Sequence, residues 1–361
     1  MTKASFAQLR LSSGEEFLGH SFGYKQSVAG EVVFNTAMTG YPESLTDPSY
    51  KGQILVLTYP LVGNYGVPEQ LVENGLLKHY ESDKIHISGL IISDYSFKYS
   101  HWNAKLSLSE WLTENKIPAL YGIDTRALTK RLREEGSMLG SIVIDNNVPE
   151  TYDPNQDNLV EQVSTKKRIV YGNGAHKILL LDCGVKYNII RSLLERDTTV
   201  ILLPWDYDFT NEEYDGLFIS NGPGDPKKCT AAISNLAKAM SSDKPIFGIC
   251  LGNQLLALAS GADTYKLKYG HRSHNQPVLA CGTNRAYITS QNHGFAIDSQ
   301  SIQGSWVPLF TNLNDNRIEG MIHKSKPFMS TQFHPEASGG PSDTIFLFDK
   351  FIDTIKEWKN R

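Results

Sequence analysis

The sequence predicts an α/β protein with two parts: a C-terminal doubly wound, mostly parallel sheet, and an N-terminal strand-rich α/β domain. After residue 176, short continuous apolar runs alternate with helical patterns, which is typical of parallel strands covered by helices on both faces. Before residue 150, short apolar runs are separated by Gly, Pro, Asp and Ser turns, with one clear helix. The length of 361 residues fits about two domains.

The N-terminal elements are short. One helix is predicted to follow Asp124, which can cap it, while Ile123 and Leu128 have the spacing of a hydrophobic staple and Gly136 stands where the helix should end. We expect this domain to cover residues 1–150. Its clearest strands are predicted at 32–34, 54–57 and 90–92.

Residues 151–175 are interpreted as a linker, because the stretch ETYDPNQDN (150–158) is polar and turn-prone and the stretch VYGNGAH (170–176) is punctuated by glycines. The second domain is then expected at 176–361. Its strands are predicted at 178–181, 199–203, 217–219 and 246–249, with helices around 189–194 and at 251–259, the latter ended by Gly261.

Composition excludes several classes of protein. The formal net charge is −4, so the basic surplus of a nucleic-acid binder is absent. No apolar stretch approaches the roughly 18 residues that cross a bilayer, and the first residues lack the apolar core of a secretory signal. The four cysteines include no CxxC pair, which argues against a zinc or dithiol motif and favours a reducing compartment. We expect a cytoplasmic protein.

The sharpest local signal is Gly248-Ile249-Cys250-Leu251-Gly252, the thiol form of a nucleophile elbow between a buried strand and a helix. The positive end of the helix dipole favours a thiolate at Cys250, and the backbone N–H of Leu251 is placed to bind an oxyanion. A buried structural cysteine in a strand-to-helix turn is the alternative.

A thiolate needs a base and the base needs an orienting group. His334 and Glu336, in Phe333-His334-Pro335-Glu336, lie two residues apart in a segment that Pro335 biases toward extended geometry, so both side chains point to one side. His293 is the second candidate base, with no acid near it in sequence.

A third loop, Asn221-Gly222-Pro223-Gly224-Asp225, follows the strand at 217–219, and its glycines let the backbone approach a ligand. It lacks the Lys-Ser/Thr ending of a phosphate loop, and a plain strand-to-helix turn is the alternative.

Three other features are given structural or solvent interpretations. His271 and His274 have no acid or Cys beside them in sequence, so no metal site is predicted. Gly172-Asn173-Gly174 precedes its strand, which argues against a dinucleotide site. Arg126, Lys130 and Arg133 share one helix face and are interpreted as solvated, with a docking surface as the alternative.

Together, GICLGNQ at 248–254, NGPGD at 221–225, QNHGF at 291–295 and FHPE at 333–336 resemble the triad-type (class I) glutamine amidotransferases. The segments FNTAMTGYPESLTDPSYKGQILVLTYPLVGNYG (34–66) and GIDTRALTKRLREEGSMLG (122–140) resemble the small, glutaminase subunit or domain of carbamoyl-phosphate synthetase. TYKLKYGHRSHNQPV and SQNHGFAID are similar to the version fused into eukaryotic pyrimidine-pathway polypeptides.

The resemblance implies that the chain hydrolyses glutamine to glutamate and ammonia. It implies Cys250 as nucleophile, His334 as proton carrier and Glu336 as its orienting group, with the N–H groups of Gly222 and Leu251 as the oxyanion hole. It also implies a large synthetase partner, subunit or fused domain, that uses ATP and Mg, and no cofactor in this chain; the carbamoyl phosphate would serve the pyrimidine or the arginine pathway. The residues implied to hold the substrate are Ser49, Gly224, Gln254, Asn292, Gly294 and Phe295; Ser49 would require the N-terminal domain to pack against the glutaminase site.

The sequence departs from the family pattern at Asn253, where many members have His, a residue that titrates as Asn does not. A urea-cycle branch of the family has a non-nucleophilic residue at the position of Cys250. Two alternatives therefore stand beside the glutaminase interpretation. One is a binding or regulatory module that keeps the fold without hydrolysis, against which Cys250, His334 and Glu336 argue. The other is an amidotransferase of anthranilate or guanylate synthesis, against which residues 34–66 argue.

Overall fold

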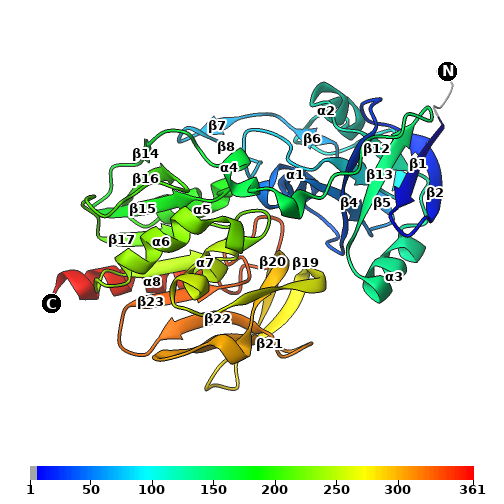
Figure 1. Cartoon of the computed structure of the whole chain (residues 1–361). Coiled ribbons are helices and arrows are strands. Elements are labelled where there is room, and N and C mark those ends of the chain that lie inside the picture. The colour runs from blue at the N-terminus through cyan, green and yellow to red at the C-terminus, as the bar shows by residue number, and fades with distance from the viewer. Residues whose placement is uncertain (1–5) are drawn as a thin grey trace. The chain divides into compact units, whose positions relative to one another are not determined.

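The computed structural model describes residues 6–361, and its contacts divide the chain into two units, with the boundary between Asp157 and Asn158 (Figure 1). None of the helices within 6–361 is long and apolar enough to cross a membrane. All four cysteines are free thiols.

The N-terminal unit is built on a closed barrel of seven strands in the order β1-β13-β3-β4-β9-β12-β2. β3, β4, β9 and β12 are parallel neighbours, and the remaining pairs are antiparallel. The barrel strands are β1 (Phe6–Leu11), β2 (Glu16–Ser21), β3 (Val28–Asn35), β4 (Gln53–Leu57), β9 (Gly89–Ile91), β12 (Ala119–Tyr121) and β13 (Met138–Ile144).

Smaller elements surround the barrel. The helices are α1 (Tyr41–Thr46), the 3-10 turn η1 (Pro48–Tyr50), α2 (Leu108–Glu114), α3 (Thr125–Glu135) and η2 (Pro154–Gln156). The short strands are β5 (Leu61–Val62), β6 (Val67–Pro68), β7 (Val72–Glu73), β8 (Leu76–Leu77), β10 (Asp94–Tyr95) and β11 (Ala104–Leu106).

The predicted helix after Asp124 is α3, and its ends follow from local chemistry. The Asp124 carboxylate accepts a hydrogen bond from the N–H of Ala127 at 2.8 Å, which caps the first turn. Gly136 ends the helix with φ 108°, a backbone conformation that favours glycine. Leu128 and Leu132 are fully buried, whereas Arg126, Lys130 and Arg133 are exposed, as expected for a solvated face.

The C-terminal unit holds a ten-stranded sheet in the order β14-β16-β15-β17-β18-β23-β22-β21-β19-β20. The sheet is mixed: β16, β15, β17, β18 and β23 are parallel neighbours, and the other pairs are antiparallel. The α/β class is confirmed, and the parallel half is the part that the alternating strand and helix patterns predict. The long ribbon of β19 and β20 was not foreseen, because it carries glycines and charges rather than a continuous apolar run.

The strands of this unit are β14 (Ile169–Tyr171), β15 (His176–Asp182), β16 (Thr198–Pro204), β17 (Gly216–Ile219), β18 (Ile246–Ile249), β19 (Thr264–Ala280), β20 (Ala286–Ile297), β21 (Trp306–Asn312), β22 (Ile318–His323) and β23 (Phe328–Thr331). The helices are α4 (Leu159–Val163), α5 (Tyr187–Leu194), α6 (Thr230–Ala239), α7 (Leu251–Ala259) and α8 (Phe346–Lys359), with 3-10 turns η3 (Pro226–Lys228) and η4 (Ser299–Ser301).

The segment 151–175, predicted as a linker, contains η2, α4 and β14. β14 forms the edge of the large sheet, where it pairs antiparallel with β16. Val160 of α4 is 1% exposed and belongs to the core of the C-terminal unit. The polar, glycine-rich composition of this segment conceals its few apolar residues, of which Val160 joins a core built from elements later in the chain.

Apolar side chains fill both faces of the parallel strands. α6 and α7 pack on one face, with Leu236, Leu255 and Leu256 against Leu179 and Leu181 of β15. On the other face, two phenylalanines of α8 contact phenylalanines of β17 and β18, mostly edge to face or tilted. Ring centroids are 5.1 to 6.2 Å apart among Phe218, Phe247, Phe348 and Phe351.

The Phe351→Ala variant should lower the free energy of unfolding by about 3–5 kcal/mol, because the cavity adds to the lost burial of the ring. Phe346→Ala, on the same helix but with a side chain 37% exposed, is the matched control and should cost about 1 kcal/mol or less. Urea unfolding followed by circular dichroism measures both. Equal losses in the two variants would contradict the assigned packing of α8.

Candidate active site

Cys250 lies between β18 and α7 in a strained turn. Its backbone has φ 54° and ψ −103°, an uncommon combination for a residue with a side chain. Its own N–H donates to the Thr331 carbonyl at 2.8 Å, which ties the turn to β23. This is the strand–turn–helix context predicted for a nucleophile elbow.

The two glycines around Cys250 are required by close backbone approach. A Cβ at Gly248 would lie 2.6 Å from the Gly252 carbonyl oxygen, and a Cβ at Gly252 would lie 2.3 Å from the Ile219 carbonyl oxygen. Neither backbone atom can yield easily, so both positions exclude side chains. The thiol itself is 2% exposed, and its Sγ lies 3.7 Å from the Asn292 carbonyl oxygen of β20.

His334 and Glu336 follow β23 and are both buried. The His334 Nδ1–H donates to Glu336 Oε1 at 2.8 Å, and the His334 backbone N–H donates to the Ser290 carbonyl of β20 at 2.9 Å. Cys250 lies close enough to His334 to raise the pKa of its imidazole. The structure therefore brings together the three residues that the sequence singled out.

Lys186 is a member of this cluster that sequence reasoning missed. It is the N-cap residue of α5, a short distance after the end of β15, and its ammonium donates to Glu336 Oε1 at 2.9 Å with a side chain only 9% exposed. Its backbone N–H donates to Asn221 Oδ1 at 3.1 Å. The available signal was its place just beyond the carboxyl end of a parallel strand, where sites in α/β sheets gather.

The buried charges set the protonation states. Burial raises the pKa of Glu336, but Lys186 and His334 outweigh it and lower that pKa to about 2. Burial also lowers the pKa of His334, but the Glu336 carboxylate and Cys250 outweigh burial and the Lys186 ammonium and raise it to about 10. These shifts favour a Glu336 carboxylate paired with a protonated His334 imidazole.

The loop Asn221–Asp225 begins after β17, at the same edge of the sheet. A Cβ at Gly222 would lie 2.0 Å from the Cys183 carbonyl oxygen, so only glycine fits there, and Gly224 has φ 83°. The Leu251 side chain lies against Gly222, and Leu251 is the first residue of α7, whose N–H has no partner within the helix. The loop thus lies against the first residue of α7, which follows Cys250 in the chain.

Four predicted substrate residues lie around this edge. The Gln254 amide donates to the Phe295 carbonyl at 2.9 Å and to Gln332 Oε1 at 3.1 Å. Asn292, Gly294 and Phe295 are on β20, and a Cβ at Gly294 would lie 3.2 Å from the guanidinium of Arg272. Ser49 lies in η1 of the N-terminal unit, where it is buried and its N–H donates to Asp47 Oδ1 at 2.9 Å.

The second candidate base, His293, has a different environment. Its Nδ1 lies 2.8 Å from the Phe295 carbonyl oxygen and its Nε2 lies 3.3 Å from Gln291 Oε1; both are acceptors, so a neutral ring donates to only one of them. Burial and the neighbouring cations His271 and Arg272 lower its pKa well below the usual range. The geometry favours His334 as the base.

Asn253, which stands where many family members have His, is buried and forms hydrogen bonds through its side chain. Its amide donates to Gln332 Oε1 at 3.0 Å, and its carbonyl oxygen accepts from the Ser330 hydroxyl at 2.8 Å. Asn253 therefore joins α7 to β23 behind the turn that holds Cys250.

One set of side chains has the composition of a metal site. His271, His293 and Glu319 offer ligand atoms within 4.8 Å of one another. Because both nitrogens of His293 already face partners and His271 pairs with carboxylates, we assign no metal to it. The sequence found no acid near His271 because Asp315 and Glu319 are distant in the chain; His274 is not a member of the set.

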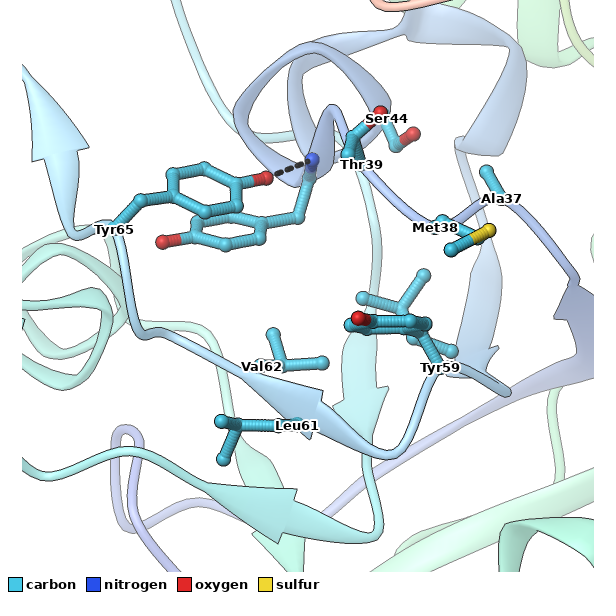
Figure 2. Close-up of a pocket in the computed structure, with 10 residues that line it drawn as sticks. Ala37, Met38, Thr39, Ser44, Tyr59, Leu61, Val62 and Tyr65 are labelled. Carbon is cyan, nitrogen blue, oxygen red and sulfur yellow. Dashed lines mark hydrogen bonds between the residues drawn. The ribbon is translucent and has the colours of Figure 1, made fainter. Parts of the chain in front are cut away.

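A pocket in the N-terminal unit is lined by residues of the segment 34–66 (Figure 2). The Tyr65 hydroxyl accepts from the Tyr41 N–H at 3.1 Å, and the two rings stack with centroids 4.2 Å apart. Its space of about 20 Å³ is that of about one water molecule. Its lining supplies no carboxylate, thiol or imidazole, and tyrosine is its only ionisable residue type. The lining residues are Ala37, Met38, Thr39, Tyr41, Ser44, Leu57, Tyr59, Leu61, Val62 and Tyr65.

Comparisons with known proteins identify the family. Residues 9–142 match the carbamoyl-phosphate synthase small chain, CPSase domain, and residues 179–354 match glutamine amidotransferase class-I. The chain is 50% identical to the carbamoyl phosphate synthase arginine-specific small chain of Saccharomyces cerevisiae, over 99% of this chain and 90% of that protein. The chain belongs to the carbamoyl-phosphate synthase small-chain family. The prediction of a glutamine amidotransferase of the carbamoyl-phosphate synthase small-chain family is therefore confirmed.

Other relatives of this small-chain family are longer. The chain is 54% identical to the multifunctional protein CAD of Squalus acanthias, over 98% of this chain and 16% of that protein. It is 50% identical to the mitochondrial carbamoyl-phosphate synthase [ammonia] of Aquarana catesbeiana, over 99% of this chain and 24% of that protein. The chain thus corresponds to a small part of some relatives and to nearly all of another.

Replacement of Glu336 by Gln should reduce stability most between pH 4.5 and 6.5. A lowered pKa makes the Glu336 contribution fully present above its ordinary pKa of 4.5 and lost as pH falls toward about 2. The raised pKa of His334 makes its contribution fully present below 6.5 and lost as pH rises toward about 10. Urea unfolding from pH 3.5 to 9 measures the difference between wild type and variant.

The matched control is Glu195→Gln, whose carboxylate is 73% exposed and lies 3.7 Å from Arg196. Its effect should be small and nearly flat over the same range. A Glu336→Gln effect that does not change with pH would contradict the assigned charges.

Proposed function

We propose that this chain hydrolyses glutamine to glutamate and ammonia with Cys250, His334 and Glu336, and supplies the ammonia to a carbamoyl-phosphate synthetase large subunit or fused domain. The observation that carries the proposal is the strained turn that holds the Cys250 thiol beside an imidazole fixed by a buried carboxylate. A thiol, a base and an orienting group in this order are the parts of a cysteine-based acyl transfer.

The reaction begins when the Cys250 sulfur, as thiolate with the proton on His334, attacks the amide carbon of glutamine. The carbonyl oxygen becomes negative and is bound by the N–H groups of Gly222 and Leu251. His334 then gives its proton to the amide nitrogen, so that ammonia leaves and a thioester remains. His334 next removes a proton from water, which attacks the thioester; glutamate leaves, and the proton returns to the Cys250–His334 pair.

Glu336 and Lys186 act on this reaction through His334. Glu336 keeps the Nδ1 nitrogen protonated, so the Nε2 nitrogen exchanges the proton with the sulfur and the leaving group. Lys186 shares Glu336 Oε1, which restrains the carboxylate and offsets its charge. The proposed substrate contacts are Ser49, Gly224, Gln254, Asn292, Gly294 and Phe295.

The proposed partner uses ATP and Mg to combine ammonia with bicarbonate, and this chain needs no cofactor for its own step. Both arginine-specific small chains and a CAD protein are similar to this chain, so the product would serve the arginine or the pyrimidine pathway. We also propose a cytoplasmic location, which the four free cysteines support.

One alternative is a regulatory or binding module of the same fold that does not hydrolyse glutamine. The similarity to carbamoyl-phosphate synthases whose name specifies ammonia favours it. The presence of Cys250 in a strained elbow, with a buried base and carboxylate, supports hydrolysis instead.

The Cys250→Ser variant should lose glutamine hydrolysis by a factor of about 10³ or more while it still binds glutamine, because an unactivated hydroxyl is a weak nucleophile at neutral pH. The control is Cys281→Ser, at a partly exposed thiol, which should keep wild-type turnover. Steady-state ammonia release and calorimetric glutamine binding are measured for both. More than about a tenth of wild-type turnover in Cys250→Ser would remove Cys250 as nucleophile.

The isolated chain should be a poor glutaminase that its synthetase partner activates when ATP and bicarbonate are present. A backbone adjustment at Gly222 or Leu251 that completes the oxyanion hole would add roughly 3 kcal/mol of transition-state stabilisation, or about a hundredfold in rate. Turnover is compared for the chain alone, with the partner, and with the partner plus ATP and bicarbonate. Equal kcat in the three conditions would show that no such activation exists.

A further inference from the structure

A second buried charged cluster lies outside the triad. His271 of β19 has its Nε2 2.9 Å from Asp315 Oδ2, in the turn between β21 and β22, and its Nδ1 3.3 Å from Glu319 Oε1 of β22. The His271 side chain is 11% exposed and that of Glu319 is fully buried. A buried carboxylate is costly unless it is paired, so His271 and Glu319 stabilise each other's charge or share a proton.

The groups around His271 determine its charge. Burial lowers the pKa of His271, but hydrogen bonds and attraction from Asp315 and Glu319 outweigh it and raise that pKa to about 9. Arg317 also pairs with Asp315, at 3.2 Å, whereas burial raises the pKa of Glu319 against the opposing effect of His271. On the β20 side lies His293, whose pKa is lowered well below the usual range by burial and by the nearby cations His271 and Arg272.

The cluster touches the strand that borders the thiol. His271 is the register partner of His293 across β19 and β20, and their rings meet edge to face with centroids 4.9 Å apart. His293 in turn lies 2.8 Å, through Nδ1, from the Phe295 carbonyl oxygen. The Phe295 carbonyl also accepts from the Gln254 amide. On the same strand, the Asn292 carbonyl oxygen lies 3.7 Å from the Cys250 sulfur.

The acid side of the cluster reaches the same turn by another route. The Glu319 carbonyl accepts from the Gln332 N–H at 2.8 Å, while Glu319 Oε1 accepts from Asn312 at 3.1 Å. The Gln332 side chain accepts from the amides of Asn253 and Gln254 of α7. The pair His271–Glu319 therefore joins β20 to the β22–β23 edge on which the elbow rests.

We propose that His271 is a positioning residue for glutamine hydrolysis: as a cation held between Asp315 and Glu319, it fixes the segment 292–295 of β20 beside Cys250 and Gln254. The inference rests on the proposed glutaminase function. It concerns the placement of glutamine, because the segment bears three of the proposed substrate contacts, and His271 itself touches neither the thiol nor the base.

The test replaces His271 by Asn and, separately, Glu319 by Gln, which keeps the shape of the carboxylate but removes its charge. Both variants should raise KM for glutamine by about tenfold with a smaller change in kcat, since a misplaced binding segment weakens substrate binding before it affects the chemistry. His323→Asn, a partly exposed histidine at the end of the same strand β22, is the matched control and should leave KM unchanged.

Histidine-selective NMR reports the charge directly. One imidazole signal, absent in His271→Asn, should titrate above the ordinary range in wild type and at lower pH in Glu319→Gln. This second variant also keeps the test available if His271→Asn does not fold. Unchanged KM in a folded variant, or a His271 signal that titrates near its ordinary pKa, would overturn the proposal.

Failure of the function itself would look different. If wild type released no ammonia, or if Cys250→Ser released as much as wild type, the glutaminase proposal would fail, whereas the NMR titration would still report the His271 charge. If wild type hydrolyses glutamine and the His271 and Glu319 variants match it, only the positioning role fails.

Discussion

The carboxylate of Glu336 is the interaction on which the geometry of the site depends. One oxygen, Oε1, accepts from the His334 imidazole at 2.8 Å and from the Lys186 ammonium at 2.9 Å. These donors come from segments that follow β23 and β15. Removal of one of these side chains would leave a buried charge without its partner. The three side chains therefore maintain one another's position.

The sheet explains why these segments meet. β15, β17, β18 and β23 are parallel neighbours, so the residues that follow them emerge at one edge. Lys186, Gly222, Cys250 and His334 follow these four strands in turn. The antiparallel half adds β20, whose Ser290 carbonyl accepts from the His334 N–H and whose Asn292 carbonyl faces the sulfur. The segments after the parallel strands thus carry the proposed reacting groups, and backbone carbonyls of β20 border His334 and Cys250.

The sequence predicted the parts of the site that local patterns encode. The elbow at Cys250, the pair His334 and Glu336, and the capped helix after Asp124 each depend on residues a few positions apart. Lys186 lies 150 residues from its partner Glu336, and His271 lies 44 residues from Asp315. Nothing in a single sequence pairs side chains over such distances, because the pairing arises from strand order and register. The same reason explains why β14 was not predicted: it is a three-residue strand whose pairing partner, β16, lies later in the chain.

The strain at Cys250 shows how the surrounding structure holds an unfavourable backbone conformation. A residue with φ near 54° and ψ near −103° persists only where its neighbours leave no alternative. Here the N–H of Cys250 is bound by Thr331, and the N–H of Gly252 by Ser220. Behind the turn, Asn253 is bound to Ser330 and Gln332 of the strand edge. A buried amide, unlike an imidazole, holds this link without a change of charge at any physiological pH, so the support of the elbow is independent of the protons that move in front of it.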